Sequence, residues 1–204
     1  MANKYRNVYC GLVNEDYVGK EVKLAGWVEN VRNLGGLVFI TLRDEKGIVQ
    51  LISNDVDKYS NLNRESTVSV DGIVKARTPD MINNNMKTGK IEVEIKSLEV
   101  LGDVYKTLPF EVKSSKTSSE ETRLKYRYLD LRNKEVHDGI VFRTKVLDFI
   151  RKTMKEMNFT EIQTPILTAS SPEGARDFIV PSRKFKGRFY ALPQAPQIFK
   201  QLLM

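Results

Sequence analysis

Alternation of polar and apolar residues marks most of the first hundred positions. The strand-like runs are residues 21–28, 37–42, 48–52, 67–74 and 91–95. Gly35-Gly36 separates the first two runs, and Asp44-Glu45-Lys46-Gly47 separates the second and third, as expected of tight hairpins. The polar residues 55–64 lie between the third and fourth runs and predict a helix or loop. Five strands with an insert at this point are typical of an OB-fold β-barrel.

The pattern changes to helical spacing beyond residue 102. Residues 114–121 are small and polar, which predicts a linker or hinge. We expect a helix over residues 137–157, short strands over 159–163, 177–180 and 189–192, and a last helix from about residue 196. Asn158 tolerates the left-handed backbone that ends many helices. Helices mixed with an incomplete antiparallel sheet predict an α+β unit.

The two patterns divide the chain into three parts. We predict an OB-fold domain over residues 1–103, a linker over 104–136 and part of an α+β domain over 137–204. The whole chain is therefore expected to be of mixed class, a five-stranded barrel followed by the beginning of a second fold.

Composition excludes several classes of protein. The chain is 41% hydrophobic and 29% charged, which is usual for a globular protein. No apolar run approaches the roughly 20 residues that cross a bilayer, and the start lacks the apolar core of a secretory signal, so no membrane partner is expected. Cys10 and His137 are the only residues of their types. They argue against a disulfide, a zinc site or a histidine-dependent nucleophile, and they favour the cytoplasm.

The net charge of +7 suggests nucleic acid, but its distribution limits that interpretation. Residues 1–101 contain 14 basic and 14 acidic side chains, so residues 102–204 carry the whole excess. Any contact between the predicted barrel and a nucleic acid must therefore come from individually placed side chains rather than from a general positive field.

Three features of the second half resemble a known family. Residues 127–132 (Arg-Tyr-Leu-Asp-Leu-Arg) are similar to a sequence shared by the aspartyl, asparaginyl and lysyl synthetases, and residues 157–167 are similar to motif 1 of class II aminoacyl-tRNA synthetases. Residues 171–178 and 191–200 resemble the aspartate-recognition segments of the aspartyl enzymes, which disfavours a lysyl or asparaginyl enzyme. The resemblance, to the bacterial aspartyl-tRNA synthetase family of class IIb, covers nearly the whole chain. It implies an anticodon-binding OB-fold before the start of a class II catalytic domain.

The resemblance also assigns substrate and interface residues. It implies that Glu173 accepts hydrogen bonds from the ammonium group of L-aspartate, that Lys200 pairs with the side-chain carboxylate, and that Gln197 contacts the substrate's carboxylate or carbonyl. Pro165 lies at the centre of motif 1, through which the family forms homodimers. Ala195 stands where the family usually has serine, which is a departure inside the expected aspartate pocket.

For the barrel, the resemblance implies binding of the anticodon loop of tRNA-Asp. Phe39 would stack on a base and Gln50 would hydrogen-bond the central uridine. The other expected contacts are Arg32, Lys75, Arg77 and Asn83. A strand aromatic considered alone is more often a core residue, and Trp27 is expected in the core or as strand support. A leucine at position 34 is similar to the residue found in enzymes that read only the aspartate anticodon. Whether the enzyme uses tRNA-Asp alone or both tRNA-Asp and tRNA-Asn stays open.

The family's reaction uses ATP and Mg²⁺ to form aspartyl-adenylate and then transfers the aspartyl group to tRNA. Motifs 2 and 3, which carry the ATP-binding arginines, are not recognised in these 204 residues. We therefore assign no catalytic residue, metal ligand or bound cofactor here, and expect this chain alone to bind an anticodon without forming adenylate. Two alternatives are a stand-alone OB-fold RNA-binding module and a paralogue that makes asparagine, although such paralogues generally lack the anticodon domain.

Overall fold

The computed structural model describes residues 3–170, 176–193 and 195–204. The chain forms two compact units, Met1–Gly139 and Ile140–Met204. Each unit is described by itself.

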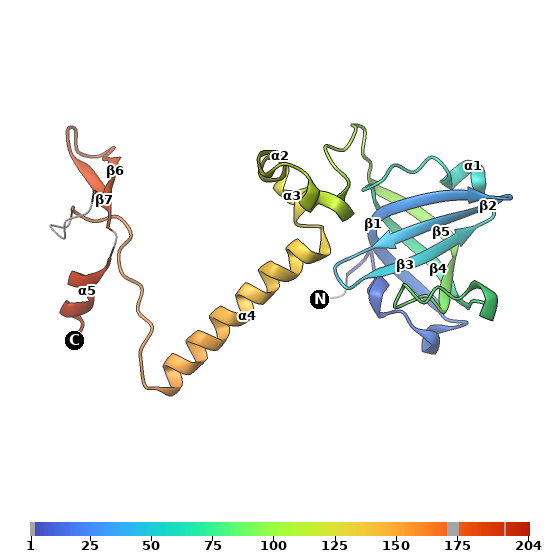
Figure 1. Cartoon of the computed structure of the whole chain (residues 1–204), viewed down its shortest axis with the longest axis horizontal. Coiled ribbons are helices and arrows are strands. Elements are labelled where there is room, and N and C mark those ends of the chain that lie inside the picture. The colour runs from blue at the N-terminus through green and yellow to red at the C-terminus, as the bar shows by residue number, and fades with distance from the viewer. Residues whose placement is uncertain (1–2, 171–175, 194) are drawn as a thin grey trace. The chain divides into compact units, whose positions relative to one another are not determined.

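A closed five-stranded barrel forms most of the first unit. Its strands are β1 (Glu21–Leu34), β2 (Leu37–Arg43), β3 (Ile48–Ser53), β4 (Thr67–Ala76) and β5 (Ile91–Gly102), in the order β1-β2-β3-β5-β4 (Figure 1). The β3–β5 pair is parallel and the other neighbours are antiparallel. A short helix, α1 (Val56–Tyr59), lies between β3 and β4. The OB-fold prediction is confirmed.

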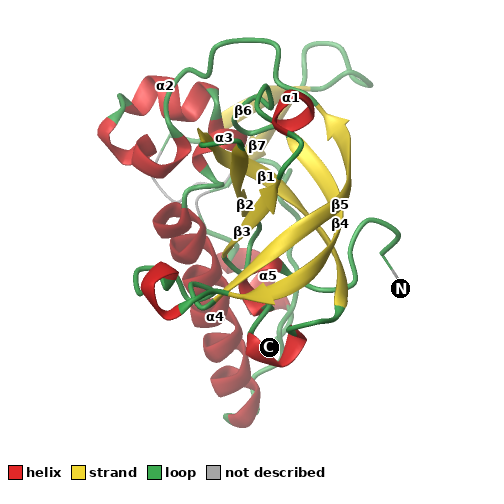
Figure 2. Cartoon of the chain, turned by 90° about the vertical axis from the view of Figure 1, so that its right-hand side faces the viewer, coloured by secondary structure: helices red, strands yellow, loops and turns green. Residues whose placement is uncertain are grey.

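The alternation along the strands separates the barrel's interior from its outer face. Figure 2 shows the strands winding around this interior. Branched aliphatic side chains fill it. The fully buried large side chains include Leu24, Ile40, Leu42, Leu51, Ile91, Val13, Val28, Val38, Val49, Val68, Val70 and Val74. Side chains point to opposite faces at successive strand positions, so Trp27, Phe39 and Gln50 belong to the outer face and are only partly buried. Trp27 is therefore not part of the barrel core.

Two tight turns set the register of β1, β2 and β3. Gly35 and Gly36 have φ of 62° and 90°, the left-handed pair that a two-residue hairpin requires. At the second turn, the Asp44 N–H donates to the Gly47 carbonyl at 2.9 Å. The Asp44 carboxylate also accepts from the Cys10 N–H at 2.6 Å, which ties the chain before the barrel to this hairpin.

Short helical turns precede the barrel, connect its strands and follow it in the chain. Residues 104–136, predicted as a linker, contain the 3₁₀ helix η4 (Val112–Thr117) and the helices α2 (Glu120–Lys125) and α3 (Arg127–Asp130). Phe110, Val112 and Leu129 form a second small core there. The remaining 3₁₀ helices are η1 (Cys10–Leu12), η2 (Glu15–Tyr17) and η3 (Pro79–Met81). The segment has structure of its own, and the domain limits at 103 and 136 remain predictions.

Asp130 is the centre of this folded segment. Its side chain is fully buried and accepts hydrogen bonds from the Ser115 hydroxyl at 2.7 Å and from Arg123 at 3.1 and 3.2 Å. Arg127 also donates to it. Burial works to raise the pKa of Asp130, but the hydrogen bonds from Arg123 and Ser115 and the two positive charges outweigh burial and hold that pKa below its ordinary value.

The second unit contains most of a long helix and a hairpin. Helix α4 (Lys134–Glu156) begins in the first unit and continues into the second. Strands β6 (Phe178–Pro181) and β7 (Phe189–Leu192) pair antiparallel, and α5 (Gln197–Leu202) follows. The described helices include none that is both long and apolar enough to cross a membrane.

One of the predicted elements is wrong. Residues 159–163 are not a strand: the Phe159 N–H donates back to the Met154 carbonyl and closes the end of α4. An alternating sequence becomes a strand only where a neighbouring backbone supplies hydrogen bonds, and the described residues provide none for 160–163. Asn158 has φ of 65°, which confirms the predicted left-handed helix end. Thr168, further on, pairs with Ala191 of β7.

Candidate nucleic-acid interface

A groove of about 1160 Å³ runs over the outer face of the barrel. Its floor comes from β1, β2 and β3, and one border is the loop between β4 and β5. Five of the six residues predicted to contact an anticodon line it: Arg32, Phe39, Gln50, Arg77 and Asn83. The sixth, Lys75, does not line this groove, and its ammonium pairs with Glu94 on β5 at 2.8 Å.

Strand register brings the floor residues together. Arg32 on β1 is opposite Phe39 on β2, which in turn is opposite Ile52 on β3. Gln50 is opposite Thr41 in the same pair of strands. Directly opposite side chains on one face lie about 5 Å apart, so the floor combines a half-buried aromatic ring, apolar surface and an amide.

Glu92 is a groove residue that the sequence reasoning missed. Its carboxylate accepts a hydrogen bond from the Gln50 side-chain amide at 3.2 Å and lies 3.6 Å from Nε of Arg77. It therefore connects two of the predicted contacts. The alternation of β5 could have indicated it, because Ile91 and Val93 face the core and Glu92 must face outward. A carboxylate here can accept from a base amino group.

Arg77 lines the groove with a side chain that is only 4% exposed. Its Nε donates to the Ile91 carbonyl at 3.0 Å, whereas Nη2 is buried and has no hydrogen-bond partner in the described part of the chain. Burial lowers the pKa of Arg77 and the Glu92 carboxylate opposes that shift. An unpaired buried donor is rare in proteins, so Nη2 is a donor that a bound acceptor would satisfy.

The loop that follows β4 is held in shape by its own contacts. Asn83 accepts from the Asn85 N–H at 3.0 Å through its side chain, and Thr88 donates its hydroxyl to the Ile48 carbonyl at 2.7 Å. Gly89 packs so closely that an added Cβ would lie 1.8 Å from the Asn83 carbonyl oxygen. These contacts fix Asn83 at the border of the groove and attach the loop to β3.

The predicted aspartate residues lie in the second unit. Gln197 and Lys200 are both exposed on α5 and are separated by three positions, so they lie on neighbouring parts of one helix surface. Glu173 lies outside the described residues. Pro165, the predicted interface residue, is exposed in the segment between α4 and Thr168. The aspartate pocket and the dimer interface therefore remain predictions.

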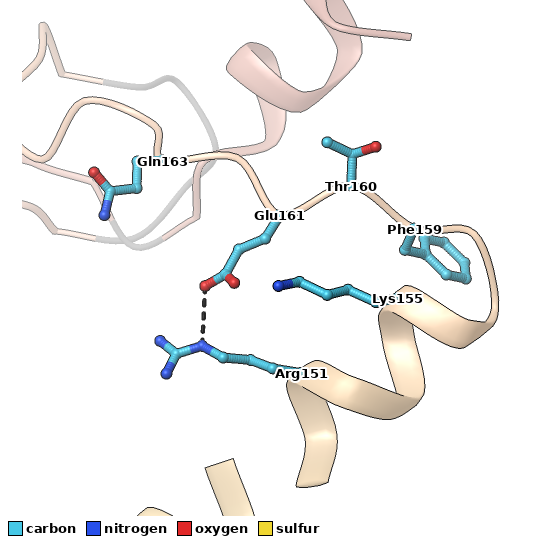
Figure 3. A pocket seen from close by; sticks show the side chains of 6 residues that line it. All are labelled: Arg151, Lys155, Phe159, Thr160, Glu161 and Gln163. Atoms are coloured by element: carbon cyan, nitrogen blue, oxygen red, sulfur yellow. Dashed lines mark hydrogen bonds and ion pairs between the residues drawn. The ribbon is translucent and has the colours of Figure 1, made fainter. Parts of the chain in front are cut away.

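A shallow hollow of about 700 Å³ lies at the end of α4. It is lined by Arg151, Lys155, Phe159, Thr160, Glu161 and Gln163 (Figure 3). Nε of Arg151 donates to the Glu161 carboxylate at 3.1 Å, and the Lys155 side chain extends toward the same carboxylate. Among the described residues of the predicted aspartate-binding surface, neither Gln197 nor Lys200 lines this hollow.

Comparison with known proteins agrees with both halves of the chain. Residues 22–101 match the family model for an OB-fold nucleic acid binding domain, and residues 119–204 match the model for class II tRNA synthetases (D, K and N). An aspartate–tRNA(Asp/Asn) ligase of Pelagibacter ubique is 51% identical over 99% of the chain. The chain belongs to the aspartyl-tRNA synthetase family. The chain spans about a third of the length of the curated relatives that it matches, 34% for the Pelagibacter protein.

The chain is also similar to a synthetase named for aspartate alone and to one named for asparagine. An aspartate–tRNA ligase of Streptomyces coelicolor is 50% identical over 99% of the chain, which spans 35% of that protein. Among solved structures, the asparaginyl-tRNA synthetase of Pyrococcus horikoshii, complexed with asparaginyl-adenylate, superimposes with a TM-score of 0.80 at 28% identity. That match covers 96% of the chain and 44% of the Pyrococcus protein, so the fold extends over both units.

Proposed function

We propose that the whole protein is an aspartate–tRNA ligase, which activates L-aspartate with ATP and transfers it to tRNA-Asp. In this proposal the first unit binds the anticodon loop. The observation that supports it most is the groove on the barrel, which brings Phe39, Gln50 and Arg77 together. The barrel matches the family model for an OB-fold nucleic acid binding domain. The 51% identity to an aspartate–tRNA(Asp/Asn) ligase supports the choice of amino acid.

The groove has the chemistry that single-stranded RNA requires. Phe39 offers a partly exposed ring for stacking, which is worth about 1–3 kcal/mol per base. The Gln50 amide donates to Glu92, which leaves its carbonyl to accept from the uracil N–H of the central base. Arg77 and Arg32 supply donors to base edges or phosphates, with Asn83 at the border. Lys75 would act outside the groove as a backbone contact.

The second unit would contribute to aspartate binding. Lys200 would pair with the substrate side-chain carboxylate, Gln197 with its α-carboxylate or carbonyl, and Glu173 with its ammonium group. ATP and Mg²⁺ would supply the activating chemistry in the whole enzyme, and no residue of this chain is assigned to either. The homodimer would form around Pro165, and the enzyme would act in the cytoplasm.

The decisive test measures binding of the chain to an anticodon stem-loop of tRNA-Asp and to the same loop with its central uridine changed. We expect the uridine loop to bind more tightly. Phe39→Ala should weaken binding to both loops, whereas Gln50→Ala should remove the preference between them. Tyr105→Ala is the matched control, because Tyr105 is 89% exposed in the same unit and lies outside the groove.

Equal and strongly salt-dependent binding to both loops would contradict the proposal and leave a general RNA-binding barrel.

A second assay addresses the activation of aspartate by ATP. We expect no aspartate-dependent ATP–pyrophosphate exchange from these 204 residues alone, and measurable exchange would overturn that expectation.

A further inference from the structure

Besides the barrel's own lining, which includes the loop between β4 and β5, the groove has a second wall that belongs to the connecting segment, residues 104–136. The wall residues follow β5 in the chain and are Thr107, Leu108, Phe110, Glu111, Val112 and Lys113. A wall made from a connecting segment has the right shape only if something holds the segment against the barrel.

The wall is attached to residues 129–133. Leu129 of α3 packs with Phe110 and Val112 in the small core. The Asn133 side-chain amide donates to the carbonyls of both Val112 and Lys113 at 2.9 Å. Any contact that fixes the position of residues 129–133 therefore also fixes the position of the wall.

Arg132 attaches these residues to the barrel. Its Nη1 donates to a Glu65 carboxylate oxygen at 2.9 Å, and its guanidinium carbon lies 4.6 Å from the centroid of the Trp27 ring. The same Glu65 carboxylate accepts two hydrogen bonds from Arg43, at 2.7 and 2.9 Å. One carboxylate thus joins an arginine of the connecting segment to an arginine of the groove floor.

Contacts other than those with the two arginines fix the position of Glu65. Its side chain is 4% exposed, and its backbone adopts φ of 65°, which is uncommon for a residue other than glycine. Its N–H donates to the Val28 carbonyl of β1 at 2.7 Å. A backbone in a sparsely populated conformation persists only where its surroundings fix it, and here it directs the carboxylate between Arg43 and Arg132.

We propose that Arg132 is a positioning residue for nucleic-acid binding: through Glu65 and Trp27 it holds residues 107–113 as the second wall of the groove. The inference rests on the proposed function, because it concerns the same groove. Arg132 does not line the groove, so it acts on the RNA through the wall. Without this contact, the wall keeps the ion pair between Glu111 and Arg64 at 2.8 Å but loses its attachment through residues 129–133. The RNA must then order more of the wall as it binds, and part of the binding free energy is lost.

The test uses the whole chain with the two stem-loops described above. Arg132→Ala should weaken binding of both loops by about tenfold while the preference for the central uridine is kept, since Gln50 and Phe39 are untouched. Arg132→Lys should recover part of the affinity, because it keeps a charge opposite Glu65 but loses the flat guanidinium over Trp27. Arg6→Ala, which removes a contact to Tyr9 outside the groove, should bind like the unmodified chain.

Trp27 is the single tryptophan of the chain, so its fluorescence reports directly on this contact. Its emission should change in Arg132→Ala and stay constant in Arg6→Ala. Unaltered affinity in an Arg132→Ala protein whose Trp27 emission has changed would overturn the inference. If Arg132→Ala does not fold, Arg132→Lys decides: reduced affinity supports the inference and unreduced affinity overturns it. Absence of central-uridine preference in the unmodified chain defeats the proposed function instead.

Discussion

The two units place their apolar side chains very differently. In the first unit, Leu42 and Leu51 are fully buried within a closed barrel. In the second, Phe142 and Phe149 of α4 are 68% and 69% exposed, and the helix has no buried residue. Both patterns were apolar and periodic in the sequence. Periodicity therefore predicts which face of an element is apolar, whereas burial depends on the elements that pack against that face.

The same difference separates the two candidate sites. The groove gathers residues from neighbouring strands whose register is fixed by hairpins and by a buried core. Gln197 and Lys200 lie on a six-residue helix with no buried residue. A site on a packed scaffold has its geometry before the ligand arrives, so the first unit is where substitutions will give interpretable effects.

The largest expected effect tests the burial contrast itself. Leu42→Ala should lower the free energy of unfolding by about 3 kcal/mol, because it leaves a cavity in the barrel core. Phe149→Ala should change it by less than about 0.5 kcal/mol, since the ring is already mostly exposed. Urea denaturation followed by circular dichroism reports both units. A loss as large for Phe149→Ala as for Leu42→Ala would remove the distinction.

The next effect concerns the buried carboxylate of the connecting segment. Asp130→Asn should cost about 2 kcal/mol near neutral pH, because three hydrogen-bonding side chains lose a charged acceptor. The folded-state pKa of Asp130 is below its ordinary value of 3.8, so its stabilisation is complete above that value and is lost as the pH falls through the lower folded pKa.

Unfolding curves at pH 7 and pH 3 check this prediction. The difference between the unmodified chain and Asp130→Asn should be smaller at the lower pH. Asp57→Asn is the control, since Asp57 is exposed on α1 and should change stability little at either pH. A difference that grows on acidification would show that the sign of the shift is wrong.

A third, smaller effect compares two cations near the site. Arg77→Met should weaken stem-loop binding by about tenfold, because it removes a buried donor from the groove. Lys75→Met should cost only about twofold, with a reduced salt dependence, since Lys75 lies outside the groove and is proposed to contact only the phosphate backbone. Titrations at two salt concentrations measure both. Equal losses would mean that the groove does not define the contact surface.

The smallest expected effect tests whether the two units act separately in RNA binding. Lys200→Met should leave stem-loop affinity unchanged within about twofold, because independent sites have nearly additive free energies. The titration used for Arg77→Met serves here too. A tenfold loss would show that α5 contributes to loop binding.

The sequence was sufficient for elements and contacts that depend on local pattern. Alternation predicted the five strands, and Asn158 predicted the end of α4. Contacts that depend on tertiary pairing were missed. Glu92 is 42 residues from its partner Gln50, and Arg132 is 67 residues from its partner Glu65. The sequence around Glu92 or Arg132 does not indicate which distant residue it contacts. The strand predicted over residues 159–163 was wrong for the same reason, because no neighbouring strand among the described residues pairs with it.

The barrel closes by a narrow seam. Strands β3 and β5 pair through Leu51 with Val93 and Ile52 with Glu94, whereas β4 and β5 pair along ten positions of β4. Gln50 and Glu92 sit one residue before this short junction, on opposite sides of it. Proteins open first where few backbone bonds must break. Local opening of the barrel between β3 and β5 would separate the Gln50 amide from the Glu92 carboxylate while β4 and β5 stay paired. The floor of the groove therefore lies over the strand pair that is expected to open most easily.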